Sequence, residues 1–88
     1  SGDSYEGEYF RGKRHGQGIY RFSNGSQYEG EFKHNLKHGN GTYKYHNGAI
    51  YSGDWANGEM HGKGRYTFAS GDVYEGDYYG GKMHGAGK

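Results

Sequence analysis

The sequence predicts an all-β fold, a β-sheet solenoid of stacked hairpins with a period of 23 residues. Three observations support this prediction: a strict internal repeat, alternation of aromatic and polar residues within each repeat, and turn signals between the alternating segments. No insertion or deletion interrupts the repeat. A period of this kind usually means one supersecondary unit per repeat, with a core that neighbouring units share.

Several residue types recur at the same spacing. Each unit begins with a tyrosine, at Tyr5, Tyr28, Tyr51 and Tyr74. An acidic residue follows, and then a His-Gly pair. The complete units cover residues 5–27, 28–50 and 51–73, and a partial unit covers residues 74–88. We therefore expect one tandem-repeat domain over residues 1–88. Residues 1–4 match the tail of a repeat, so we also expect the chain to be a section of a longer array.

Alternation within each unit indicates two strands. In residues 5–9 the aromatic and glycine positions share one face and the acids share the other, and residues 18–22 follow the same pattern. A loop that contains Gly12 and Gly16 is expected to join the two strands into a hairpin. Asn-Gly or Ser-Gly pairs at 24–25, 47–48 and 70–71 accept the positive φ of a turn into the next hairpin.

The aromatic faces of the stacked hairpins are predicted to form the core, with glycine leaving room for a ring opposite. Trp55 should be largely buried, beside Tyr51 and rings of neighbouring strands such as Tyr43 or Tyr66. The predicted core consists of Tyr5, Tyr9, Tyr20, Phe22, Tyr28, Phe32, Tyr43, Tyr45, Tyr51, Trp55, Tyr66, Phe68, Tyr74 and Tyr78.

Composition excludes several classes of protein. Aromatic residues make up 18% of the 88 residues, which argues against disorder despite 20 glycines. A formal net charge of +1 is too balanced for a general nucleic-acid binder, so no nucleic-acid partner is expected. The absence of cysteine excludes disulfides and thiolate zinc sites and fits a reducing, cytoplasmic location. Without an apolar run of about 20 residues, any membrane contact would be peripheral.

The repeated residues carry a resemblance to a known family. Tyr-Glu-Gly-Glu-Tyr/Phe followed by Gly-Lys-x-His-Gly-x-Gly resembles the MORN (membrane occupation and recognition nexus) repeat over essentially the whole chain. The resemblance implies an elongated, twisted, single-layered antiparallel sheet. MORN arrays occur in junctophilins, phosphatidylinositol phosphate kinases, radial spoke heads, a lysine methyltransferase family and parasite cytoskeletal proteins. Their usual role is protein–protein scaffolding, and lipid binding has been proposed. This chain departs from the pattern at Asn35, where other units have glycine, and at Ser52, where others have glutamate.

Two polar columns were considered as sites of chemistry. Equivalent histidines in stacked hairpins would lie ~10 Å apart, too far to share a zinc ion whose ligands each lie ~2.1 Å away. The same objection applies to the acidic column. Glu6 and Glu8 lie roughly 7 Å apart on one strand face, but a single-layered sheet offers no water-excluding pocket for them. We expect no catalytic residue, no metal site and no cofactor.

Positions that differ between units are the candidates for partner recognition, because the repeated positions build the rod. Exposed aromatic and methionine side chains often anchor interfaces. On this basis the candidate protein-binding residues are Phe10, Leu36, Met60, Tyr79 and Met83. Basic residues near an anionic leaflet favour membrane contact, and the candidate anionic-lipid ligands are Arg11, Lys13, Arg14 and Lys37.

The sequence therefore favours a non-catalytic scaffold that binds protein partners, a second copy of the chain among them, in a cytoskeletal or membrane-adjacent assembly. Two alternatives stay open. One is a peripheral membrane or phosphoinositide-binding module, and the other is a regulatory section of a larger enzyme such as a lipid kinase.

Overall fold

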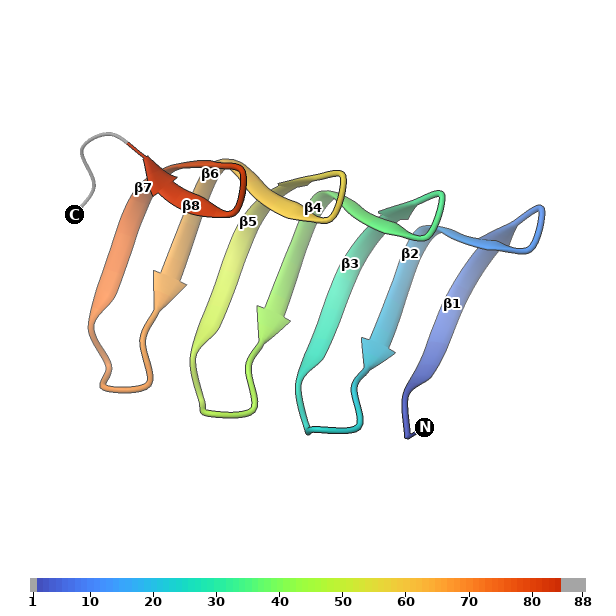
Figure 1. Ribbon diagram of the computed structural model, residues 1–88, viewed down its shortest axis with the longest axis horizontal. Helices are drawn as coiled ribbons and strands as arrows, with labels where there is room; N and C mark the ends of the chain where they lie inside the picture. Colours follow the sequence, from blue (N-terminus) through green and yellow to red (C-terminus); the bar gives the residue numbers. More distant parts are fainter. Residues whose placement is uncertain (1, 85–88) are drawn as a thin grey trace.

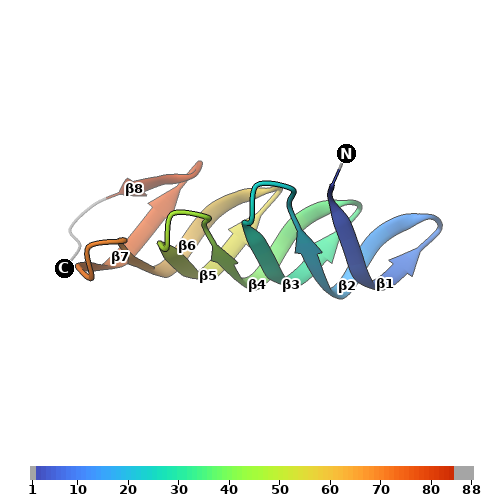
Figure 2. The same ribbon diagram turned by 90° about the horizontal axis from the view of Figure 1, so that it is seen from below.

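The computed structural model describes residues 2–84, which form one open antiparallel sheet with its strands in chain order. The strands are β1 (Ser4–Phe10), β2 (Lys13–Arg21), β3 (Gln27–Lys33), β4 (Leu36–Lys44), β5 (Ile50–Ala56), β6 (Glu59–Thr67), β7 (Val73–Tyr79) and β8 (Lys82–His84). Each odd strand and the even strand after it form a hairpin, and the hairpins follow one another along the 40 Å axis (Figure 1). Figure 2 shows the same row from below, and residues 2–84 form no second layer on it. The predicted fold class, an elongated single-layered antiparallel sheet, is confirmed.

The hairpin tip is tighter than the sequence suggested. The loop expected around Gly12 and Gly16 is reduced to Arg11 and Gly12, with φ of 53° and 80°, and β2 begins at Lys13. Gly16 instead lies within β2 at φ 76°. Opposite it, the β1–β2 register shifts between Gly7 and Tyr9. This bulge bends the hairpin, since an unpaired stretch in one strand kinks the ladder. Each hairpin in Figure 1 changes direction near its upper end.

The turn between hairpins uses the expected Asn-Gly pair in a three-residue form. The Phe22 amide donates to the Ser26 carbonyl at 2.9 Å, and the Gly25 amide donates to the Phe22 carbonyl at 3.1 Å. Gly25 has a φ of 96°. A type I turn followed by a left-handed residue is a common three-residue hairpin loop. The Asn24 side chain closes the turn by accepting the Ser26 amide at 2.8 Å.

The first tyrosine of each unit lies across a pair of glycines. Gly30 and Gly41 face each other on β3 and β4, and the fully buried Tyr28 covers Gly41 so closely that a Cβ there would overlap its ring. The Tyr28 hydroxyl reaches past the glycines and donates to the Glu31 carbonyl at 2.8 Å. The same bond recurs from Tyr5 to Glu8, from Tyr51 to Asp54 and from Tyr74 to Asp77.

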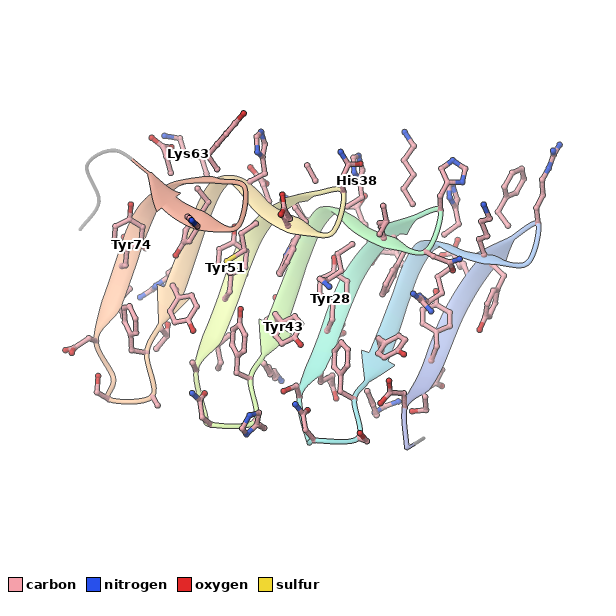
Figure 3. All side chains as sticks on the ribbon, in the orientation of Figure 1. Tyr28, His38, Tyr43, Tyr51, Lys63 and Tyr74 are labelled. Carbon is pink, nitrogen blue, oxygen red and sulfur yellow. The ribbon has the colours of Figure 1, made fainter. Side chains whose placement is uncertain are left out.

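The core is a row of rings on one face of the sheet, which we call the inner face. Figure 3 shows Tyr28, Tyr43, Tyr51 and Tyr74 along this face. Its buried members are Tyr28, Phe32, Tyr51, Trp55 and Tyr78. Other hydrophobic residues pack against them and are partly buried: Tyr5, Tyr20, Phe22, Tyr43, Tyr45, Met60, Tyr66 and Tyr74.

Trp55 occupies the place that alternation predicted. It is 5% exposed, and its ring centroid lies 5.2 Å from that of Tyr51, 5.4 Å from Tyr28 and 6.1 Å from Tyr43. Its indole Nε1 donates to the Gly41 carbonyl at 3.1 Å.

Two residues assigned to the core are exposed within residues 2–84, because burial in this row comes from rings of neighbouring units. Tyr9 is 61% exposed. Its counterparts Phe32, Trp55 and Tyr78 each pack edge-to-face on the first tyrosine of the preceding unit, whereas Tyr9 contacts Tyr5 of its own unit. Phe68 is 39% exposed. It contacts Tyr66 at 4.8 Å, whereas the equivalent Phe22 also contacts Tyr43 of the next unit, at 5.5 Å.

The repeated acids hold the bulge in place. A carboxylate oxygen of Glu31 accepts the Asn40 amide at 3.2 Å, and one of Asp54 accepts the Lys63 amide at 3.1 Å. Glu8 makes the equivalent bond to Gln17 at 3.4 Å. Each donor directly follows the positive-φ glycine of the bulge. The acid column thus satisfies main-chain donors that leave the sheet ladder there.

Replacing Trp55 with alanine should cost about 3–5 kcal/mol of unfolding free energy, because it removes a buried ring from the middle of the row. Thermal or urea unfolding of Trp55→Ala beside the parent chain measures this loss. Phe10→Ala is the control, because Phe10 is 51% exposed and its removal should cost much less. Equal stability of Trp55→Ala and the parent would contradict the assignment of the inner face.

Replacing Glu31 with alanine should cost about 1–2 kcal/mol, because the Asn40 amide at the bulge loses its acceptor. Glu29→Ala is the matched control: Glu29 is exposed on the same strand, and it should cost less than about 0.5 kcal/mol. Both values come from urea unfolding. If the two variants are equally stable, the carboxylate at the bulge contributes nothing and this role for the acid column is wrong.

Candidate functional site

A pocket opens on the inner face where the tips of neighbouring hairpins lean over the rings. Its volume is about 150 Å³. Tyr20, Phe22 and Tyr28 contribute aromatic walls, and Arg14 and Lys37 contribute positive charge. We call this recess the cationic pocket.

The strand register explains why charged side chains lie over the aromatic core. Arg14 is the cross-strand partner of Tyr9, and Lys37 is the partner of Phe32. Met60 has the same relation to Trp55. Directly opposed residues on neighbouring strands share a face of the sheet. The row Arg14, Lys37 and Met60 therefore runs along the inner face, with one member from each hairpin.

Arg14 is held against three rings and one carbonyl. Its guanidinium carbon lies 4.9 Å from the Tyr20 ring centroid, 5.5 Å from Phe32 and 5.8 Å from Tyr5. Nη2 donates to the Asn35 carbonyl at 2.9 Å. Nε is buried and has no hydrogen-bond partner within residues 2–84. Cation–π attraction and one hydrogen bond thus orient the side chain and leave donor capacity unused.

Lys37 lies in a similar cage. Its Nζ is 5.4 Å from the Trp55 ring, 5.7 Å from Tyr43 and 5.8 Å from Tyr28. Burial lowers the pKa of Lys37 below its usual range, and the positive charge of Arg14 lowers it further. The two cations therefore lie close enough to repel each other.

Within residues 2–84, no carboxylate forms an ion pair with Arg14 or Lys37. In the described part of the chain, the ion pairs join Arg21 to Glu6, Lys63 to Asp77 and Arg65 to Glu75, away from the cationic pocket. Burial raises the pKa of the Tyr28 hydroxyl, and the hydrogen bond to Asp3 raises that of the Tyr20 hydroxyl, so both tyrosines that line the pocket are neutral near pH 7. The cationic pocket is thus positively charged and lined by neutral aromatic surface.

The row of cationic side chains on the inner face ends at the second hairpin, because the third hairpin has Met60 at this position. Met60 occupies the position of Arg14 and Lys37 and packs against the buried rings. In the fourth hairpin the backbone of Met83 pairs with Tyr78, and its side chain lies outside what the structure describes. The inner face changes from cationic to apolar between the second and third hairpins.

The candidate protein-binding residues do not form one surface. Phe10 and Tyr79 are 51% and 67% exposed and contact His15 and His61 in tilted arrangements, each with ring centroids 5.5 Å apart. They lie on the side of the tips opposite to the inner face, because they follow Tyr9 and Tyr78 in the strands. Leu36, in contrast, borders the cationic pocket. Met60 lies on the inner face itself.

The four candidate lipid ligands are also divided. The Arg11 guanidinium lies 5.2 Å from the Phe10 ring, and Lys13 is the cross-strand partner of Phe10, so both belong to the outer side of the tip. Arg14 and Lys37 belong to the inner side. The sequence analysis did not predict this separation. It also did not predict that core rings such as Tyr20 and Phe22 line the pocket. The sequence does contain one signal: Arg14 and Lys37 each follow the aromatic residues Tyr9 and Phe32 by five positions. Only the register of the bulged hairpin shows that this spacing places each cation on the same face as the ring.

The histidine column holds no metal-binding cluster. Within residues 2–84, no group of three or more His, Cys, Asp or Glu side chains could hold an ion. His38 lies at the tip end of its hairpin, apart from the labelled tyrosines in Figure 3. The same part of the chain contains no helix with the length and hydropathy to span a bilayer.

Comparison with known proteins identifies the repeat. A family model described as MORN repeat matches residues 5–27, 28–50, 51–73 and 74–88. No curated protein sequence matches the chain. MORN repeats are non-catalytic modules that generally mediate interactions with proteins or membranes. The chain belongs to the MORN repeat family.

Proposed function

We propose that this MORN section is a non-catalytic module that binds a segment of a partner protein along its inner face. The observation that carries the proposal is the cationic pocket, a recess of about 150 Å³ lined by rings and two unneutralised cations. A pocket of aromatic walls with a few charged groups is typical of a recognition site.

The open sheet exposes its inner face for binding, and no part of residues 2–84 has to unfold to uncover it. No second layer covers the inner face in the described chain (Figure 2). Tyr20, Phe22, Tyr43 and Tyr45 are therefore only partly buried. Tyrosine side chains combine a large apolar ring with a polar group, and they are enriched where proteins meet. A partner that covers these rings gains hydrophobic contact along the row.

The partly buried rings pack against one another along the row. Tyr43 contacts Phe22 at 5.5 Å and Tyr45 at 4.5 Å, and Tyr45 contacts Tyr66 at 5.7 Å. These contacts restrict the rotamers of the exposed rings. A preorganised surface loses less side-chain entropy on binding, which raises affinity.

The competing functions have less support. The carboxylates of the acid column are engaged with main-chain amides at the bulges, so their repetition has a structural cause. The basic residues considered for lipid binding lie on two sides of the tips, so a flat bilayer would contact only some of them at once. A second copy of the chain is one form that the protein partner can take, and a cytoskeletal or membrane-adjacent assembly is the setting we propose.

Selection from a random 12-residue phage-displayed library on the 88-residue chain tests this proposal. We expect enriched peptides whose binding shifts the NMR signals of Tyr43, Tyr45 and Phe22. Tyr45→Ala should weaken such a peptide at least about tenfold, the equivalent of ~1.4 kcal/mol of lost contact. Arg65→Ala, which removes an exposed ion pair elsewhere on the sheet, should leave the affinity unchanged. Thermal unfolding checks that both variants stay folded.

Two results would contradict the proposal. One is a library from which no peptide is enriched. The other is a set of enriched peptides whose binding is insensitive to Tyr45→Ala and whose NMR shifts map to the outer side of the tips, around Phe10 and Tyr79.

A further inference from the structure

We infer that Arg14 and Lys37 together bind one carboxylate of the partner segment, the side chain of an aspartate or glutamate. This inference rests on the proposed function, because it places the acidic residue in the cationic pocket of the inner face. It also sets a register for the segment: an apolar residue should lie about four or five positions away, over Met60.

The charge arrangement requires an anion for its neutralisation. Arg14 and Lys37 line the same recess, and in the described chain neither pairs with a carboxylate. Like charges in a partly desolvated site destabilise each other. The lowered pKa of Lys37, caused by burial and by Arg14, agrees with this geometry. A bound carboxylate between the two cations removes the repulsion.

The unused hydrogen-bond donors point to the same ligand. Nε of Arg14 is buried without a partner, and the structure gives Lys37 Nζ only ring contacts within residues 2–84. A carboxylate has two acceptor oxygens and forms short, charge-assisted bonds with such donors. The pocket volume of about 150 Å³ corresponds to roughly five water molecules at ~30 Å³ each, enough for an acidic side chain.

The shape of the site favours a peptide over a membrane surface. The two cations lie in a recess walled by Tyr20, Phe22 and Tyr28 and bordered by Leu36. An acidic side chain of an extended segment can enter the recess while its neighbours lie on the rings. Headgroups in a bilayer lie in one plane, and the projecting tips would meet that plane first.

The repeat spacing gives the register. Two strands at ~4.8 Å advance the sheet by ~10 Å per hairpin, and an extended segment advances ~3.3 Å per residue. Three residues of a segment that follows the row therefore span one hairpin. A carboxylate held between Arg14 and Lys37 lies about one and a half hairpins, ~15 Å, from Met60. The segment therefore presents about its fourth or fifth following or preceding residue to this apolar site.

The chain itself provides a matched substitution. Lys37→Met and Arg14→Met copy Met60, which occupies this position against the same kind of ring cage. Each should fold like the parent while losing one charge. Lys44→Met is the control: Lys44 is exposed and alternates with Tyr43, so it faces away from the inner face.

The library selection described above is repeated on the parent chain, Lys37→Met, Arg14→Met and Lys44→Met. The parent and Lys44→Met should enrich peptides with Asp or Glu about four or five positions from an apolar residue. Lys37→Met and Arg14→Met should lose the acidic preference. For one enriched peptide, acetylated and amidated at its ends, a Glu→Gln or Asp→Asn change should weaken binding to the parent at least about tenfold. The same change should have little effect on Lys37→Met, and 0.5 M NaCl should weaken the parent complex more than the Lys37→Met complex.

The other outcomes separate the two proposals. Peptides that bind the inner face without an acidic preference, equally well on Lys37→Met, would overturn the carboxylate site and leave the proposed function standing. A library with no inner-face binder overturns both. Flotation with phosphatidylserine vesicles that depends on Arg14 and Lys37, without binding of acidic peptides, would assign the pocket to lipid headgroups and overturn the inference.

Discussion

The whole architecture depends on one packing constraint, a tyrosine ring laid across two glycines on neighbouring strands. Tyr28 can lie flat over the Gly30–Gly41 pair only because neither residue carries a Cβ, and its hydroxyl then reaches the Glu31 carbonyl. The ring thus covers main chain that a second layer would cover in a sandwich. This is how a chain with 30% hydrophobic residues builds a core from one layer. Each buried tyrosine also forms a platform for the next hairpin. Trp55, for example, packs edge-to-face on Tyr28.

The bulge converts this flat arrangement into a trough. At Gly39 strand β4 loses its regular pairing with β3 while it stays paired with β5, and the carboxylate of Glu31 accepts the amide of Asn40. Because the tip leans over after the bulge, the residue opposite Phe32, which is Lys37, comes to lie above the rings of Tyr28, Tyr43 and Trp55. The acid column therefore contributes to recognition indirectly, by supporting the bend that brings the row over the core.

The sequence predicted the parts of this structure that depend on local spacing. The period placed every hairpin, and alternation placed Trp55 in the core, because both follow from one strand at a time. The position of Gly16 inside β2 was missed, since a bulge depends on how two strands pair and a single strand carries no signal for it. The exposure of Tyr9 was missed for a related reason: its burial depends on a ring from a neighbouring unit. The cationic pocket was missed for the same reason. In the sequence Arg14 and Lys37 resemble solvated charges, and only the strand register places them over aromatic rings.

The row that faces the trough is also the one whose side chains the fold leaves free to vary. Neighbouring tips are joined there through main-chain atoms: the Gly58 amide donates to the Lys37 carbonyl at 2.9 Å, and the Gly81 amide donates to the Met60 carbonyl at 3.0 Å. These bonds are the same whether the side chain is lysine or methionine. Asn35 replaces glycine at the first such junction, keeps the turn at φ 70°, and makes the same main-chain bond to Arg14. Each hairpin can therefore present a different side chain over its rings without loss of the contact that stacks it. This separation of stacking from recognition allows a repeated scaffold to carry a non-repeated binding pattern.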